Sequence, residues 1–84
     1  MSISLVITSL KQAEDTVSSI EHQYSLRNQD VNWHVGLQNR TSVATQELNE
    51  ACDSKEITYM KWQELSRRVY AVQDALVDAG LWRN

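Results

Sequence analysis

The sequence has no proline, no phenylalanine and only two glycines among its 84 residues. Because tight turns between β-strands depend on Gly, Pro and Asn-Gly pairs, this composition argues against a sheet protein. Hydrophobic residues make up 42% of the chain and charged residues 23%, which is typical of a globular chain and not of a disordered one. The sequence therefore predicts an all-α fold.

Cysteine, long apolar runs and a basic surface are also scarce. The only cysteine, Cys52, cannot form an internal disulfide, which fits a reducing compartment. No apolar run approaches the roughly 18 residues of a membrane-spanning helix, and the first ten residues lack the features of a signal peptide. The net charge is −3, and the pair Arg67-Arg68 alone makes no basic face. We therefore expect a cytoplasmic protein with neither a membrane nor nucleic acid as a partner.

Residues suited to catalysis or metal binding form no recognisable set. His22, His34 and Cys52 are the soft ligands of this chain, and no two of them are three or four positions apart. The sequence has no glycine-rich phosphate loop, no serine nucleophile motif and no paired catalytic acids. We expect no enzymatic activity, no metal or other cofactor, and no small-molecule substrate.

Apolar residues recur at alternating steps of three and four in three segments, which is the spacing of a coiled-coil seam. The expected helices cover residues 3–28, 33–51 and 55–79. They predict one helical domain over residues 1–84, a three-helix bundle with antiparallel neighbours and coiled-coil-like packing. The seam residues are Ile3, Val6, Leu10, Ala13, Val17, Ile20 and Tyr24, then Trp33, Leu37, Thr41, Ala44, Leu48 and Ala51, and finally Trp62, Leu65, Val69, Val72, Leu76 and Ala79.

The third segment carries helix-end signals on both sides. Asp53 or Ser54 can cap its start, with Glu56 completing a capping box after Asp53. At its end, Gly80 suits the left-handed position of a Schellman motif, and Leu81 suits the hydrophobic contact of that motif. These signals favour a separate third helix.

A two-helix hairpin is the alternative fold. The seven-residue phase of the second segment continues into the third, and neither Gly nor Pro lies between residues 37 and 79. One long helix over residues 34–79 would pair with the first segment. Against it, Lys55 and Thr58 would occupy seam positions, so we prefer three helices.

The stretch Asn-Trp-His-Val-Gly at residues 32–36 starts the second segment. Asp30 and Asn32 are both good N-cap residues, which places Trp33 on the seam at one end of the bundle. Gly36 lies one turn inside the helix, where glycine costs up to about 1 kcal/mol relative to alanine. A closely passing backbone or an irregular first turn would explain this glycine.

Two motifs resemble the WXG100 class of small secreted helical hairpins. That class carries a Trp-x-Gly turn between its helices and Tyr-x-x-x-Asp/Glu near its C-terminus. Here Tyr70 and Asp74 match the second pattern, and the stretch from Trp33 to Gly36 is similar to the first with one extra residue. The resemblance implies a secreted hairpin, which we keep as an alternative function.

Four acidic residues recur at every third position, namely Glu47, Glu50, Asp53 and Glu56. One interpretation is a solvated face with helix-capping charge. The other is an acidic patch for a basic partner, as in a small inhibitor that mimics nucleic acid, of the kind that phages direct at host enzymes.

The third segment also carries a second apolar stripe. At about 100° per residue, Tyr59, Tyr70 and Val77 cluster away from the seam. The stripe packs either inside the bundle or against another protein, where tyrosine is favoured. We therefore expect a protein–protein interaction module: an adaptor, a co-chaperone or a small inhibitor. A dimer is expected as well, because the middle segment offers only Leu37 and Leu48 as large aliphatic core residues.

Overall fold

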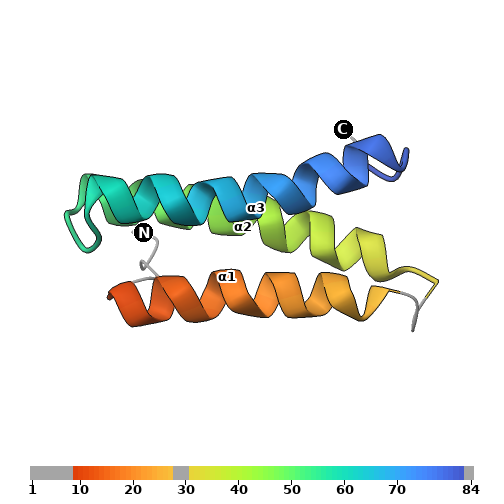
Figure 1. The fold of residues 1–84 in the computed structure, drawn as a ribbon, viewed down its shortest axis with the longest axis horizontal. Coiled ribbons are helices and arrows are strands. Elements are labelled where there is room, and N and C mark those ends of the chain that lie inside the picture. The colour runs from red at the N-terminus through yellow and green to blue at the C-terminus, as the bar shows by residue number, and fades with distance from the viewer. Residues whose placement is uncertain (1–8, 28–30, 83–84) are drawn as a thin grey trace, which may run out of the picture.

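The computed structural model describes residues 9–27 and 31–82, which form three helices. Helix α1 spans Leu10–Ser25, α2 spans Trp33–Asp53 and α3 spans Tyr59–Asp78. Consecutive helices run antiparallel, and each helix contacts the other two (Figure 1). The predicted all-α three-helix bundle is confirmed. The two-helix hairpin, which is also the fold that the WXG100 resemblance implied, is wrong because the chain reverses between α2 and α3.

A Schellman motif ends α2 and turns the chain. Lys55 adopts the left-handed conformation, with φ at 64°. The Glu56 amide donates to the Ala51 carbonyl at 2.8 Å, and the Lys55 amide donates to the Cys52 carbonyl at 3.1 Å. A lysine thus holds a position that usually takes glycine. The helix can therefore end here although the region contains neither Gly nor Pro.

Helix α3 begins later than predicted. Thr58 has an extended backbone, and its side chain accepts a hydrogen bond from the Lys61 amide at 3.2 Å, which makes it the N-cap. The predicted cap at Asp53 or Ser54, with a helix from residue 55, is wrong because these two residues belong to the end of α2.

The other end of α3 follows the prediction. Gly80 has φ at 74°, and its amide donates to the Val77 carbonyl at 2.9 Å. The Leu81 amide donates to the Leu76 carbonyl at 2.9 Å, and the Leu81 side chain packs against the core. The Schellman stop is therefore confirmed, with α3 ending at Asp78.

The first two helices differ from prediction at their ends. Ser9 is the N-cap of α1, and its side chain accepts a hydrogen bond from the Gln12 amide, so α1 begins at Leu10. The predicted start of this helix at residue 3 lies outside the described residues. α1 ends three residues before the predicted end at residue 28, and α2 continues two residues past the predicted end at 51. The predicted seam residues Ile3 and Val6 and the predicted cap Asp30 lie outside the described residues.

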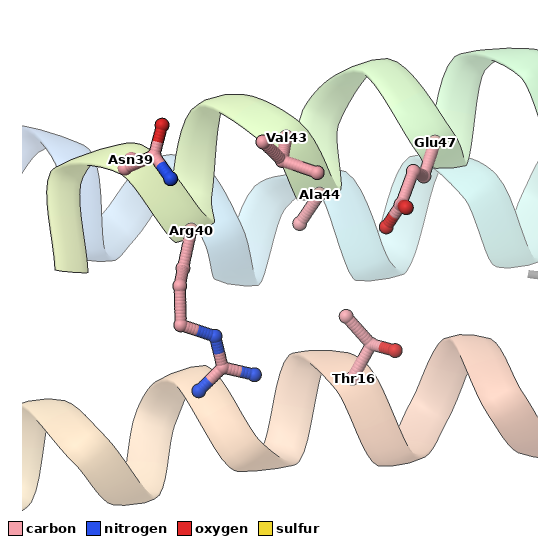
Figure 2. A pocket seen from close by; sticks show the side chains of 6 residues that line it. All are labelled: Thr16, Asn39, Arg40, Val43, Ala44 and Glu47. Carbon is pink, nitrogen blue, oxygen red and sulfur yellow. The ribbon is translucent and has the colours of Figure 1, made fainter. Parts of the chain in front are cut away.

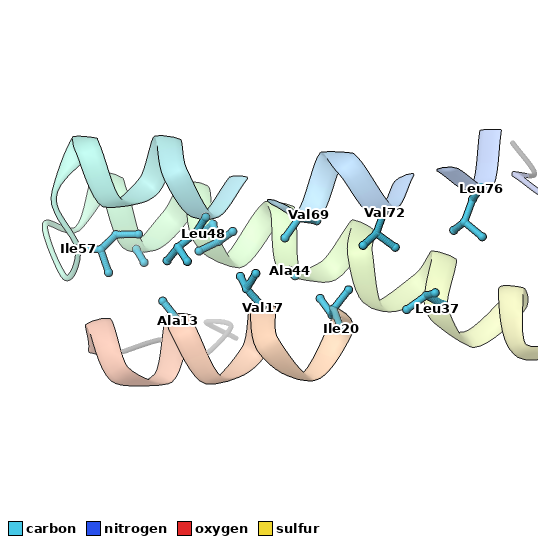
Figure 3. Packing of buried hydrophobic residues seen from close by; sticks show 12 residues of the cluster. Ala13, Val17, Ile20, Leu37, Ala44, Leu48, Ile57, Val69, Val72 and Leu76 are labelled. Atoms are coloured by element: carbon cyan, nitrogen blue, oxygen red, sulfur yellow. The ribbon is translucent and has the colours of Figure 1, made fainter. Parts of the chain in front are cut away.

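An apolar core fills the space between the helices (Figure 3). Its residues follow the predicted steps of three and four in each helix. Trp33 and Trp62 are half-buried at its edges, and Ala79 is exposed because it lies beyond α3. The buried hydrophobic residues are Ala13, Val17, Ile20, Leu37, Ala44, Leu48, Ala51, Ile57, Leu65, Val69, Val72 and Leu76.

Two buried residues were not expected from the seam. Ile57, from the loop between α2 and α3, is only 5% exposed and covers one end of the core. Ser66, in α3, is 6% exposed. Thr41 was expected on the seam of α2, and its buried hydroxyl donates to the Gln38 carbonyl at 2.8 Å. The hydrogen bond satisfies a polar group that burial would otherwise destabilise.

Polar side chains join α1 to both other helices. Arg68 of α3 makes a two-pronged hydrogen bond to the Glu21 carboxylate of α1, which lowers the pKa of Glu21. Arg40 of α2 donates to Gln23 Oε1 at 2.7 Å and to Ser19 Oγ at 3.0 Å. These contacts fix the orientation of α1 against its neighbours.

No close contact in the described part of the chain requires a glycine at position 36. A Cβ atom at this position would lie 4.0 Å from the Gln23 side-chain nitrogen, which is ordinary van der Waals distance, and within the described residues no atom outside its own stretch of α2 would come closer. The expectation of a closely passing backbone is therefore wrong.

Candidate functional site

The predicted second stripe of α3 faces away from the core. Tyr59 is 63% exposed, Tyr70 44% and Val77 54%. The interpretation that this stripe packs inside the bundle is wrong, because all three side chains are exposed. Tyr59 alone of the three also lies beside residues of α2. We call these three residues the outer α3 face. Met60, which sequence reasoning did not single out, is 78% exposed beside Tyr59.

The outer α3 face is a line of separate side chains and not a closed patch. Tyr59 and Tyr70 are three helical turns apart, or about 16 Å along the axis, and Val77 lies two turns further on. A partner that touches all three residues must therefore run along α3. An extended segment or a helix of another chain has the required shape.

A pocket of about 390 Å³ lies where α2 ends and α3 begins. We call it the aromatic pocket. Tyr59 and Trp62 form its aromatic wall, with ring centroids 5.3 Å apart and planes tilted by 34°. The indole nitrogen of Trp62 donates to Asn49 Oδ1 at 2.8 Å, which holds the ring in place. The lining residues are Asn49, Cys52, Asp53, Tyr59 and Trp62.

A second groove lies between α1 and α2 (Figure 2). Arg40 crosses from α2 towards α1 at one end, and Glu47 points towards α1 at the other, with Thr16 on the facing side. Burial and, secondarily, the like charge of Glu50 raise the pKa of Glu47. In the described ranges 9–27 and 31–82, no ion pair neutralises Glu47.

The predicted acidic row is divided between two depressions of the surface. Glu47 lines the groove between α1 and α2, whereas Asp53 lines the aromatic pocket. Glu50 lies between them on α2, and Glu56 is exposed in the loop that follows. A step of three residues falls about 60° short of a full helical turn, so such a row winds around the helix. The structure therefore brings no more than one of the four to the aromatic pocket.

Sequence reasoning missed three residues of the aromatic pocket. Trp62 was assigned to the seam alone, although its spacing of three from Tyr59 places the two rings on neighbouring positions of one helix. Asn49 and Cys52 carried no such signal. Their position beside α3 depends on the left-handed turn at Lys55, which the sequence did not reveal.

Metal-ligating side chains remain scattered in the part of the chain that the structure describes. No three of its His, Cys, Asp and Glu residues gather closely enough to hold a metal ion. The His34 ring packs edge-on against Trp33, with centroids 5.8 Å apart, and Trp33 in turn packs edge-on against Tyr24 at 5.9 Å. Across the same described residues, no helix is both long and apolar enough to cross a membrane.

Comparisons of the chain with protein-family models, with curated proteins and with solved structures found no match. The functional interpretation is therefore built on the outer α3 face and the aromatic pocket.

Proposed function

We propose that this chain is a small, non-catalytic protein–protein interaction module, and that it contacts its partner through the outer α3 face. The proposal rests on the difference in exposure between the seam of α3 and the outer α3 face. Val69 is 1% exposed and Leu65 is fully buried, whereas Tyr59 and Val77 are more than half exposed. Aromatic residues, tyrosine among them, are enriched in the buried centres of protein–protein interfaces.

An adaptor, a co-chaperone or an inhibitor of a larger cytoplasmic protein would use such a face, and so would a homodimer. A nucleic-acid mimic would instead need a continuous acidic surface to imitate a row of phosphates. Glu47 and Asp53 line two different depressions, so the acidic row supports the mimic less well than the apolar face supports the module.

The test is a comparative capture from a lysate of the source organism. The immobilised proteins are the wild type, the double variant Tyr70→Ala/Val77→Ala, and the control Gln46→Ala, which alters an exposed residue of α2. Melting curves first show that all three are folded. We expect proteins that the wild type and the control retain and the double variant loses. Equal capture by all three would contradict the proposal.

A further inference from the structure

We infer that the aromatic pocket binds an arginine side chain presented by a basic segment of a partner protein. The inference rests on the proposed function, since Tyr59 belongs both to this pocket and to the outer α3 face. It adds the chemistry of one contact that the partner makes.

The aromatic wall is a pair of rings that pack against each other, with centroids 5.3 Å apart, so a planar cation would stack on the outside of the pair and not between the rings. Among aromatic residues, tryptophan binds cations most strongly through its ring. The hydrogen bond from the Trp62 indole to Asn49 fixes the ring before any ligand arrives. A guanidinium group stacks on such rings better than the compact ammonium of lysine.

One carboxylate, that of Asp53, lines the same pocket. Asp53 lines it as the last residue of α2, and the last turn of α2 contains no basic residue. A carboxylate at a helix C-terminus is unfavourable to the helix, because that end already carries partial negative charge. The charge of Asp53 therefore destabilises the end of α2, and the same charge would attract a cation to the pocket. Its carboxylate accepts the hydrogen bonds that a stacked guanidinium donates at its edge.

The described residues place no cation of their own over these rings. Within residues 9–27 and 31–82, the arginine that covers a ring is Arg27, which lies 4.6 Å from the centroid of Tyr24. Lys61 pairs with Glu14 and Glu64. Lys55 is close in sequence but does not line the pocket. The aromatic pocket is thus open to an external cation.

The experiment uses the full chain labelled with ¹⁵N and three short glycine–serine peptides that carry arginine, lysine or the neutral arginine analogue citrulline. The arginine peptide should shift the indole N–H signal of Trp62 and the side-chain amide of Asn49, and leave the indole signal of Trp33 in place. We expect binding about fivefold weaker for the lysine peptide, and no response to the citrulline peptide.

Two variants that remove the same charge locate the site. Asp53→Asn should weaken the arginine peptide about fivefold, whereas Glu56→Gln, which alters a carboxylate outside the pocket, should change its affinity less than about twofold. Asp53→Asn should melt no lower than the wild type, because it removes an unfavourable helix-end charge.

Three results would overturn the inference: an equal response to citrulline, equal binding of lysine and arginine, or equal weakening by the two variants. Tyr70→Ala/Val77→Ala lies outside the pocket and should leave the arginine response intact. The two proposals can therefore fail separately. If the double variant loses the natural partner but the wild type shows no response to the arginine peptide, the inference about the pocket is refuted and the proposed function stands. If the wild type responds to the arginine peptide but the double variant still captures the partner, the proposed contact through the outer α3 face is refuted and the inference about the pocket stands.

Discussion

Val69 and Val77 lie about 80° apart around α3, and the same substitution at each compares a core position with an exposed one. Val69 is 1% exposed and Val77 is 54% exposed. The replacement of valine by alanine removes two carbon atoms at either site. Alanine has a higher helix propensity than valine, and this gain is similar at both sites. The difference in stability between the two variants therefore reports how deeply each valine is buried.

The structure gives the expected size of that difference. At about 0.8 kcal/mol per buried carbon, Val69→Ala loses about 1.6 kcal/mol of transfer free energy, and the cavity it leaves adds to this loss. Val77→Ala loses about half the transfer term and leaves no cavity. The gain in helix propensity, about 0.5 kcal/mol, offsets most of what remains. We expect a difference of at least about 1 kcal/mol, which is roughly 4–8 °C in melting temperature for a chain of this size.

Urea unfolding followed by circular dichroism measures both variants. The midpoint should fall clearly for Val69→Ala and stay near the wild type for Val77→Ala, with the same slope m for all three proteins. Equal destabilisation by the two variants would refute the reasoning. It would mean that Val77 packs inside the molecule, and the outer α3 face would lose one of its three residues.

Three further predictions concern other parts of the molecule. Gly36→Ala should stabilise the protein by about 0.5–1 kcal/mol, because its helical position has room for a Cβ atom, and a lower urea midpoint would contradict this. The Arg68–Glu21 pair is partly exposed, so Arg68→Gln should cost less than about 1 kcal/mol at neutral pH. Because the pKa of Glu21 is lowered in the folded state, this contribution is present above its unfolded pKa and is lost as the pH falls through the folded pKa. The same cost in acid and at neutral pH would count against the ion pair. Finally, we expect a dimer in sedimentation equilibrium at high micromolar concentration, and a monomer that melts well above about 60 °C would argue against it.

The sequence was a good guide to the core, because burial follows helical period. The seam residues that the structure describes inside the three helices are buried or half-buried, apart from Leu10 in the first turn of α1, which is 36% exposed. The period also separated the outer α3 face from the seam. Gly80 was readable as a helix stop, since glycine adopts the left-handed conformation without strain.

The loop between α2 and α3 could not be predicted in the same way. Its left-handed residue is Lys55, and lysine carries no such signal. As a result, the cap of α3 was placed at Asp53 or Ser54 and not at Thr58. The aromatic pocket was missed with it, because its walls come from both sides of that loop. The division of the acidic row has another reason: residues three apart wind around a helix, so Glu47 and Asp53 line different depressions.

The most direct test of the outer α3 face is the affinity of a purified partner, identified by the comparative capture, for single alanine variants. The measurement uses isothermal titration at a temperature at which circular dichroism shows every variant folded. Tyr59→Ala and Tyr70→Ala should each bind at least about tenfold more weakly than the wild type, which is about 1.4 kcal/mol. The control Gln46→Ala should match the wild type. If Tyr59→Ala and Tyr70→Ala bind as tightly as Gln46→Ala, the partner does not bind the outer α3 face, and the proposed function is contradicted.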